Sequence, residues 1–309
     1  MDELQGAVHL METNRVDEGI AELEALVEEN PDISLYHSLL AMGYRQRGEF
    51  DHSLEELKMA VDLAPNNALA HVSLAAIYIL QDETDLAGQE LALAEELGAD
   101  DEITQQMLGE VYALVRDLDR AEENLRVAVE QAPDDARTLL SLAGLYSLQN
   151  RHQEALDTLD RVLELEPGMV DAQVSRGYVH LRRAEFDQAA EVFDQALESA
   201  PEDPGVHSAL SLLHFLQGDL DGARQEAEEA LALNPYDQDA HCHLALACQA
   251  AGDLEQGLAA AREALRLDPK DDLAHYALGL CYRDLGQEAE AVDAFETFLA
   301  LYWDRPYSR

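Results

Sequence analysis

The chain has 309 residues, of which 47% are hydrophobic, so it can bury a substantial core and is not a disordered polymer. Its 64 Asp and Glu outnumber its 20 Lys and Arg, and the resulting net charge of −44 argues against a nucleic-acid partner, because such a field repels phosphates. No apolar run reaches the roughly 18 residues that span a bilayer, and the first residues do not form a signal peptide. We therefore expect a cytoplasmic protein without direct membrane insertion, unless a signal or anchor has been removed.

The acidity has two interpretations. Lysine is nearly absent, with Lys58 and Lys270 the two examples, which is typical of an acidic, arginine-preferring proteome such as that of a salt-adapted organism. An acidic surface of this kind is also suited to attracting a basic protein partner. The sequence leaves both interpretations open.

The predicted elements are helices that recur with a period of 34 residues. Ala, Leu and Glu dominate, and no run alternates Val, Ile and Thr, so the sequence predicts an all-α fold. Prolines mark the period, with Ala99 in the one position that breaks the series: Pro31, Pro65, Pro133, Pro167, Pro201, Pro235 and Pro269. This spacing predicts a single array over residues 1–309. The predicted repeats are 1–33, 34–67, 68–101, 102–135, 136–169, 170–203, 204–237, 238–271 and 272–305.

Within a repeat, three kinds of position recur in chain order. The first helix carries an aromatic column, preceded by leucines and small residues: Tyr44, Tyr78, Tyr112, Tyr146 and Tyr282. The turn that follows carries residues that tolerate a left-handed backbone: Asn14, Gly48, Asn150, Gly218, Gly252 and Gly286. The second helix carries a small-residue column, as close helix contact requires: Gly19, Ser53, Ala87, Ala121, Ala155, Ala189, Ala223, Gly257 and Ala291.

On these columns the chain resembles the tetratricopeptide repeat family, from Met1 to about Arg305. The resemblance implies a right-handed α-solenoid of about nine helix-turn-helix repeats, in which first helices line a concave groove and second helices lie outside. A lone helical hairpin cannot bury its apolar face, so neighbouring repeats must stack and share one core.

The stretch DAHCHLALAC, from Asp239 to Cys248, superficially suggests a metal or redox site. His241 aligns with His37, His71, His207 and His275, however, which indicates a packing role, and Cys248 falls in the tyrosine column. We expect Cys242 to project toward the groove and His243 to point about 100° away, so the two cannot converge on one ion. Motifs for phosphate binding, metalloproteases or serine hydrolases are missing, so we predict no metal, no cofactor, no catalytic residue and no enzyme.

Counting along the first helices predicts the groove surface. We expect it to bind a partner through thirteen residues: Val72, Ile79, Leu80, Val174, Tyr178, Leu181, Arg182, Leu212, Phe215, Leu216, Leu246, Tyr276 and Leu280. Each apolar side chain has a second interpretation, which is packing against the next repeat. Family members that clamp a C-terminal carboxylate use lysine and asparagine in the groove, whereas this chain has Ser38, Met42 and Arg45 there, so we expect no such clamp.

The leading hypothesis is a non-catalytic scaffold that binds an apolar peptide or helix of a partner protein, anchored by residues such as Tyr178, Leu212 and Phe215, during assembly of a multiprotein complex. A second hypothesis is a self-associating array, a homo-oligomer formed through the C-terminal end. Solenoids usually close with a polar capping helix, whereas this sequence finishes with Phe298, Leu301, Tyr302 and Trp303, so we expect either that the chain continues beyond Arg309 or that this end stacks against another chain. A third hypothesis is the substrate-recruiting part of a longer enzyme.

Overall fold

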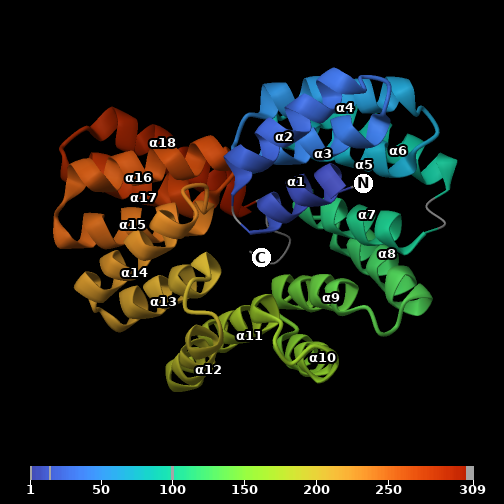
Figure 1. The fold of residues 1–309 in the computed structure, drawn as a ribbon. Coiled ribbons are helices and arrows are strands. Elements are labelled where there is room, and N and C mark those ends of the chain that lie inside the picture. Colours follow the sequence, from blue (N-terminus) through green and yellow to red (C-terminus); the bar gives the residue numbers. More distant parts are fainter. Residues whose placement is uncertain (1, 14, 99–100, 304–309) are drawn as a thin grey trace. The chain divides into compact units, whose positions relative to one another are not determined.

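The computed structural model describes residues 2–13, 15–98 and 101–303, and every regular element in these ranges is an α-helix (Figure 1). This confirms the predicted all-α repeat fold. The chain divides into two compact units, residues 1–145 (the N-terminal unit) and residues 146–309 (the C-terminal unit). The boundary falls inside helix α9.

The N-terminal unit consists of four helix pairs and the first part of α9. Its helices are α1 (Asp2–Glu12), α2 (Val16–Glu29), α3 (Ser34–Gln46), α4 (Phe50–Leu63), α5 (Ala68–Leu80), α6 (Thr84–Leu97), α7 (Glu102–Leu114), α8 (Leu118–Gln131) and α9 (Ala136–Leu148). The first two pairs pack against the next pair through their second helix, α2 on α3 and α4 on α5. First helices also contact one another, as α5 does with α7.

The C-terminal unit repeats the same arrangement. Its helices are α10 (His152–Leu165), α11 (Val170–Arg182), α12 (Phe186–Ser199), α13 (Pro204–Gln217), α14 (Leu220–Leu233), α15 (Gln238–Ala251), α16 (Leu254–Leu267), α17 (Asp272–Asp284) and α18 (Glu288–Trp303). Each predicted repeat therefore contains one helix pair.

The turn between the two helices of a repeat has a left-handed backbone. Gly48, Gly218, Gly252 and Gly286 have φ between 73° and 88°, and Asn150 has φ 58°, as predicted; Asn14 lies outside the described residues. Three non-glycine residues hold the same conformation in the same column: Asp82, Arg116 and Ala184. In each of these turns the next N–H donates to the carbonyl five residues back, for example Glu49 to Tyr44 at 2.8 Å. This bond satisfies a helix-end carbonyl, which explains why the strained conformation is retained.

The small-residue column of the second helix is buried throughout the described residues. At Ser53 the two helices of a repeat lie so close that its hydroxyl donates to the backbone carbonyl of Ala41 on the facing helix, at 2.8 Å. The first helix is equally constrained, since a Cβ added to Gly177 would lie 2.1 Å from the ring of Phe193. The predicted close contact between paired helices is confirmed.

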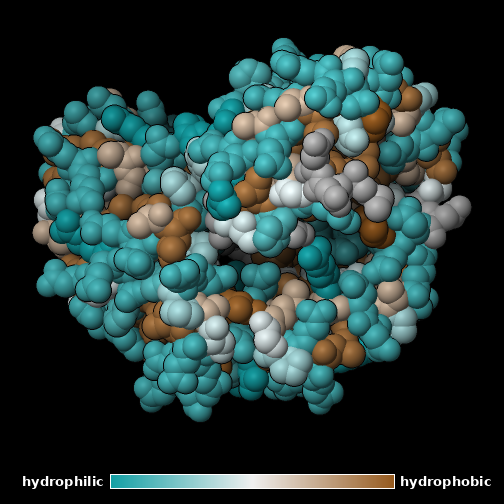
Figure 2. All heavy atoms as spheres, viewed as in Figure 1, coloured by the Kyte–Doolittle hydropathy of each residue, from teal (hydrophilic) through white to brown (hydrophobic). Residues whose placement is uncertain are grey.

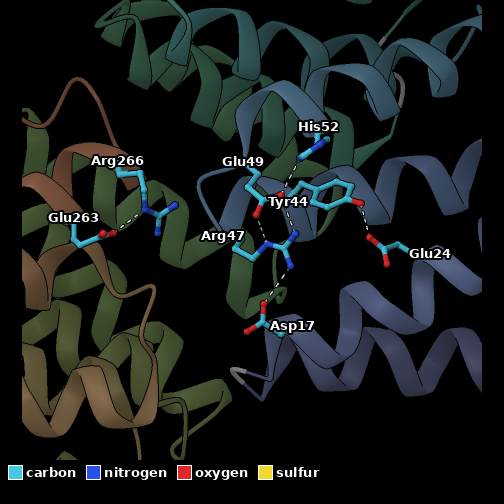
Figure 3. A network of polar contacts seen from close by, with 8 residues as sticks. All are labelled: Asp17, Glu24, Tyr44, Arg47, Glu49, His52, Glu263 and Arg266. Carbon is cyan, nitrogen blue, oxygen red and sulfur yellow. Dashed lines mark hydrogen bonds and ion pairs between the residues drawn. The ribbon is translucent and has the colours of Figure 1, made fainter.

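A cation lies over the ring of every tyrosine in the aromatic column. The distances from cation to ring centroid are between 4.2 and 6.0 Å for the pairs Arg47–Tyr44, Lys58–Tyr78, Arg120–Tyr112, Arg151–Tyr146 and Arg262–Tyr282. Figure 3 shows the first of these sites, where Arg47 also pairs with Asp17 and Glu49, and Tyr44 donates to Glu24 at 2.6 Å. These contacts join α2, α3 and α4, so several of the few cations reinforce packing between helices.

The histidine column has a packing role, and its geometry was not predicted. In all five histidines Nε2 donates to the carbonyl of the preceding repeat's proline, at 2.8 to 3.1 Å. In His37, His71 and His207, Nδ1 also lies 2.6 to 2.7 Å from a glutamate of the second helix: Glu56, Glu90 and Glu226. A carbonyl can only accept, so the second contact requires a further proton between Nδ1 and the carboxylate. Each such histidine links the inter-repeat loop to a second helix.

The stretch Asp239–Cys248 lies on α15, and its two cysteines and His243 are buried. Cys248 is fully buried, as expected for the tyrosine column. Cys242 is also buried, near Gln238 and Asp271, so its predicted projection into the groove is wrong. His243 donates from Nδ1 to the carbonyl of Ser208 at 3.0 Å. Within the described residues no three His, Cys, Asp or Glu side chains gather as a metal site would require.

Candidate functional site

A pocket of roughly 280 Å³ opens in the N-terminal unit among α3, α4, α5 and α7. Its wall is mainly apolar and includes Leu35, Leu39, Met42, Leu69, Ile77, Ile103, Met107 and Leu114. Ser38, Ser73 and Ala76 also line it, and these short side chains leave the space that larger ones would fill. Repeats that otherwise pack tightly thus enclose a hollow apolar surface.

Three large apolar side chains converge on this pocket while remaining open to solvent. Leu35 is 54% exposed, Ile103 62% and Leu114 55%. Most of the face drawn in Figure 2 is hydrophilic, as 64 acidic residues would produce. An exposed apolar cluster on such a surface is typical of a binding site for another molecule.

A more polar cavity of roughly 560 Å³ adjoins the pocket and shares Ile103, Met107 and Glu110 with it. Its remaining lining comes from α7 and the start of α9: Glu102, Gln106, Asp135 and Arg137. The hydroxyl of Ser141 donates to Glu110 at 2.7 Å, and that of Thr138 donates to Glu102 at 3.1 Å. These bonds fix the carboxylates beside the apolar pocket.

Arg45 lines the apolar pocket on α3. Partial desolvation lowers the pKa of its guanidinium, and the nearby charge of Glu110 offsets this in part. The guanidinium of Arg45 makes no hydrogen bond or ion pair with any residue that the structure describes. The pocket therefore has a cation, Arg45, on its α3 side and a fixed carboxylate, Glu110, on its α7 side.

Four of the thirteen predicted groove residues belong to the core. Val72, Ile79, Leu181 and Leu246 are at most 8% exposed, so their side chains cannot reach a partner in this structure. Leu181 belongs to the core cluster around Phe193, and Leu246 to the core cluster around Leu244. The interpretation as packing residues holds for these four.

The other predicted residues retain more surface, and their partner-binding role stays a prediction. Val174, Tyr178 and Leu212 pack partly against the core cluster around Phe193, and Tyr178 meets that ring edge-on at 5.9 Å. Phe215 and Leu280 pack partly against the core cluster around Leu244, and Leu80 is half-buried at the end of α5. Arg182, Leu216 and Tyr276 are exposed, although Tyr276 also contacts Phe298 at 5.1 Å. The side chains of Tyr302 and Trp303 lie outside the described residues.

The sequence contains a signal for the pocket that the count along first helices missed. Leu35, Leu69 and Ile103 lie 34 residues apart at the second position of successive repeats, and all three line the pocket. Leu39, Ser73 and Met107 form the same kind of column four residues later. The predicted residue Val72 lies one position before Ser73, and one residue turns a helix by about 100°, so Val72 faces another direction.

None of the helices in the described ranges is long and apolar enough to cross a bilayer. No curated protein sequence matches the chain. Solved structures do: the human IFIT1 dimer with PPP-AAAA has a TM-score of 0.58 and 18% identity, covering 97% of this chain and 72% of that one. The APC/C hetero-tetramer Cut9-Hcn1 has a TM-score of 0.57 and 17% identity, covering 97% of this chain and 60% of that one.

A tetratricopeptide repeat protein from Parabacteroides merdae ATCC 43184 has a TM-score of 0.59 and 16% identity, with coverage of 84% and 98%. At these identities the likeness establishes the fold. The tetratricopeptide repeat pattern itself matches residues 4–68, 174–238 and 243–306, and a second pattern of the same description matches residues 114–177. With most of its length matched, the chain belongs to the tetratricopeptide repeat family.

Proposed function

We propose that this protein is a non-catalytic scaffold that binds a segment of a partner protein through the apolar pocket of the N-terminal unit. Tetratricopeptide repeats generally mediate protein–protein interactions and complex assembly. The observation that carries the finer proposal is the convergence of exposed Leu35, Ile103 and Leu114 on one hollow.

The expected affinity follows from the size of the pocket. A buried Leu or Phe side chain contributes about 1.5–3 kcal/mol, and a volume of roughly 280 Å³ holds one or two such side chains. Further contacts along the groove add to this, while association and ordering subtract several kcal/mol. A dissociation constant of about 1 μM corresponds to about −8.2 kcal/mol, so micromolar binding requires contacts beyond the pocket.

The test is to pan a displayed random-peptide library against the wild-type protein. Peptides that also bind a variant carrying Ile103→Glu and Leu114→Glu are removed from the selection. Both side chains are more than half exposed, so the variant should fold, which circular dichroism checks. Met59→Glu is the matched control, since Met59 is 45% exposed on α4 and does not line the pocket.

Peptides that bind the wild type and Met59→Glu, but not the double variant, would support the proposal. Failure to enrich any such peptide would contradict it and favour self-association or recognition of a large folded surface.

A further inference from the structure

The carboxylates of the polar cavity are held in place but not saturated. Glu102 accepts from Thr138 through Oε1, and Glu110 accepts from Ser141 and Gln106 through Oε1. Asp135 accepts the backbone N–H of Thr138 through Oδ2 at 2.7 Å. The second oxygen of each carboxylate receives no hydrogen bond from any residue in the described part of the chain. Three positioned acceptors therefore remain available at one cavity.

The apolar pocket and this cavity form one continuous surface with an uneven charge. They share Ile103, Met107 and Glu110, so a segment that fills the pocket passes beside the carboxylates. Arg137 lines the cavity as well, which leaves three carboxylates against one guanidinium there. Arg45 lines the apolar pocket but not the cavity, whereas Glu110 lines both.

We propose that the partner segment carries a lysine or arginine next to its apolar anchor, and that this cation binds the carboxylates of Glu102, Glu110 and Asp135. The inference rests on the proposed function and specifies the partner as a basic, amphipathic segment. Charge complementarity supports this proposal both at contact distance and at long range. The spare carboxylate oxygens accept hydrogen bonds from a cation, which are stronger than neutral ones. The net charge of −44 also speeds the approach of a basic partner.

The long-range field and the local contacts can be separated by variants of equal charge. Glu102→Gln with Glu110→Gln removes two charges at the cavity while keeping an amide oxygen for Thr138 and Ser141. Glu28→Gln with Glu29→Gln removes the same two charges at the exposed end of α2. The net charge, and with it the distant field, changes equally in both variants.

The probe is the strongest peptide that requires Ile103 and Leu114, compared with a version in which its Lys and Arg are replaced by Gln. At about 150 mM salt we expect the cavity variant to weaken binding about five- to tenfold and the α2 variant less than about twofold. The neutralised peptide should bind the wild type as weakly as it binds the cavity variant, because each change removes the same contact.

Equal losses in the two variants would overturn the inference in favour of general charge attraction. Pocket-dependent peptides without a Lys or Arg would also overturn it, and would leave the proposed function standing because the Ile103 and Leu114 requirement is measured separately. If no pocket-dependent peptide is found, both the inference and the proposed function fail.

Discussion

His207 and His241 occupy the same position in their repeats but differ in the partner of one ring nitrogen. Nδ1 of His207 meets Glu226 at 2.7 Å, whereas Nδ1 of His241 is buried without a hydrogen bond from the described residues. Burial alone would lower the pKa of His207, but the bonds to Glu226 and to the Pro201 carbonyl raise it above the usual value, with Glu229 adding to this. Burial lowers the pKa of His241, which the Pro235 carbonyl and Glu263 only partly offset, while Arg266 adds to the lowering.

An NMR titration should therefore give His207 a higher pKa than His241, and Glu226→Gln should lower the pKa of His207 alone. Because the folded pKa of His207 lies above its unfolded value of about 6.5, the pair stabilises the fold fully below that pH. The stabilisation is lost as pH rises through the folded pKa. Equal pKa values for the two histidines would contradict the assigned geometry.

Asp237 is a carboxylate whose charge opposes folding. It caps α15 by accepting from the Ala240 N–H at 2.9 Å, yet burial and the nearby charges of Asp239 and Asp203 raise its pKa to about 6. Because the folded pKa lies above the unfolded value near 3.9, stability falls as pH rises between the two. Asp237→Asn keeps the cap and should raise the free energy of unfolding by about 1 kcal/mol at pH 7, and by nothing at pH 3. Urea unfolding at both pH values measures this.

The turn between paired helices depends on one residue whose backbone is left-handed. Ala184 holds φ 56° where Gly218 holds φ 84°, in the same column one repeat apart. A left-handed conformation costs a residue with a Cβ roughly 1–2 kcal/mol, and glycine nothing comparable. The structure retains Ala184 because the helix-end bond from Glu185 to His180, 2.9 Å long, requires that conformation.

We expect Ala184→Gly to raise the free energy of unfolding by about 1 kcal/mol and Gly218→Ala to lower it by a similar amount. Both residues are exposed, and an added Cβ at Gly218 would meet nothing within 4 Å, so packing does not contribute. Denaturant unfolding followed by circular dichroism compares the two. A destabilised Ala184→Gly would show that the turn is not strained.

The elements themselves could be predicted from sequence, whereas the binding surface could only be predicted in part. Proline, turn and small-residue columns recur because each meets a requirement of the helix pair alone, as Ser53 and Gly177 show. Exposure in the groove depends instead on what the next repeat presents. Val72 is buried and the adjacent Ser73 lines the pocket, a distinction of one helical step that hydrophobicity does not reveal. The histidine–glutamate pairs do have a sequence signal that the analysis of single columns missed, because Glu56, Glu90 and Glu226 each follow their histidine by 19 residues.

At the scale of the whole molecule, the main feature is the large excess of negative over positive side chains. A net charge of −44 destabilises any compact state through self-repulsion, and salt screens it, with a Debye length of about 10 Å at 0.1 M and about 3 Å at 1 M. Several of the cations are engaged with tyrosine rings, as at Arg151 and Tyr146, so they are tied to particular local contacts.

Raising NaCl from about 20 mM to about 1 M should therefore raise the melting temperature by several degrees, although the ion pairs weaken. Thermal unfolding across a salt series measures this, with sucrose as an uncharged additive for comparison. A melting temperature that falls with salt would mean that the ion pairs outweigh the repulsion.

Two methionines, Met42 and Met107, form part of the wall of the apolar pocket. A thioether side chain is unbranched and polarizable, so such a wall can adjust its shape to leucine, phenylalanine or methionine at little cost. The pocket can therefore accept apolar side chains of several shapes. Discrimination between partners then depends on the charged groups around its opening, because a residue of the wrong charge there is repelled.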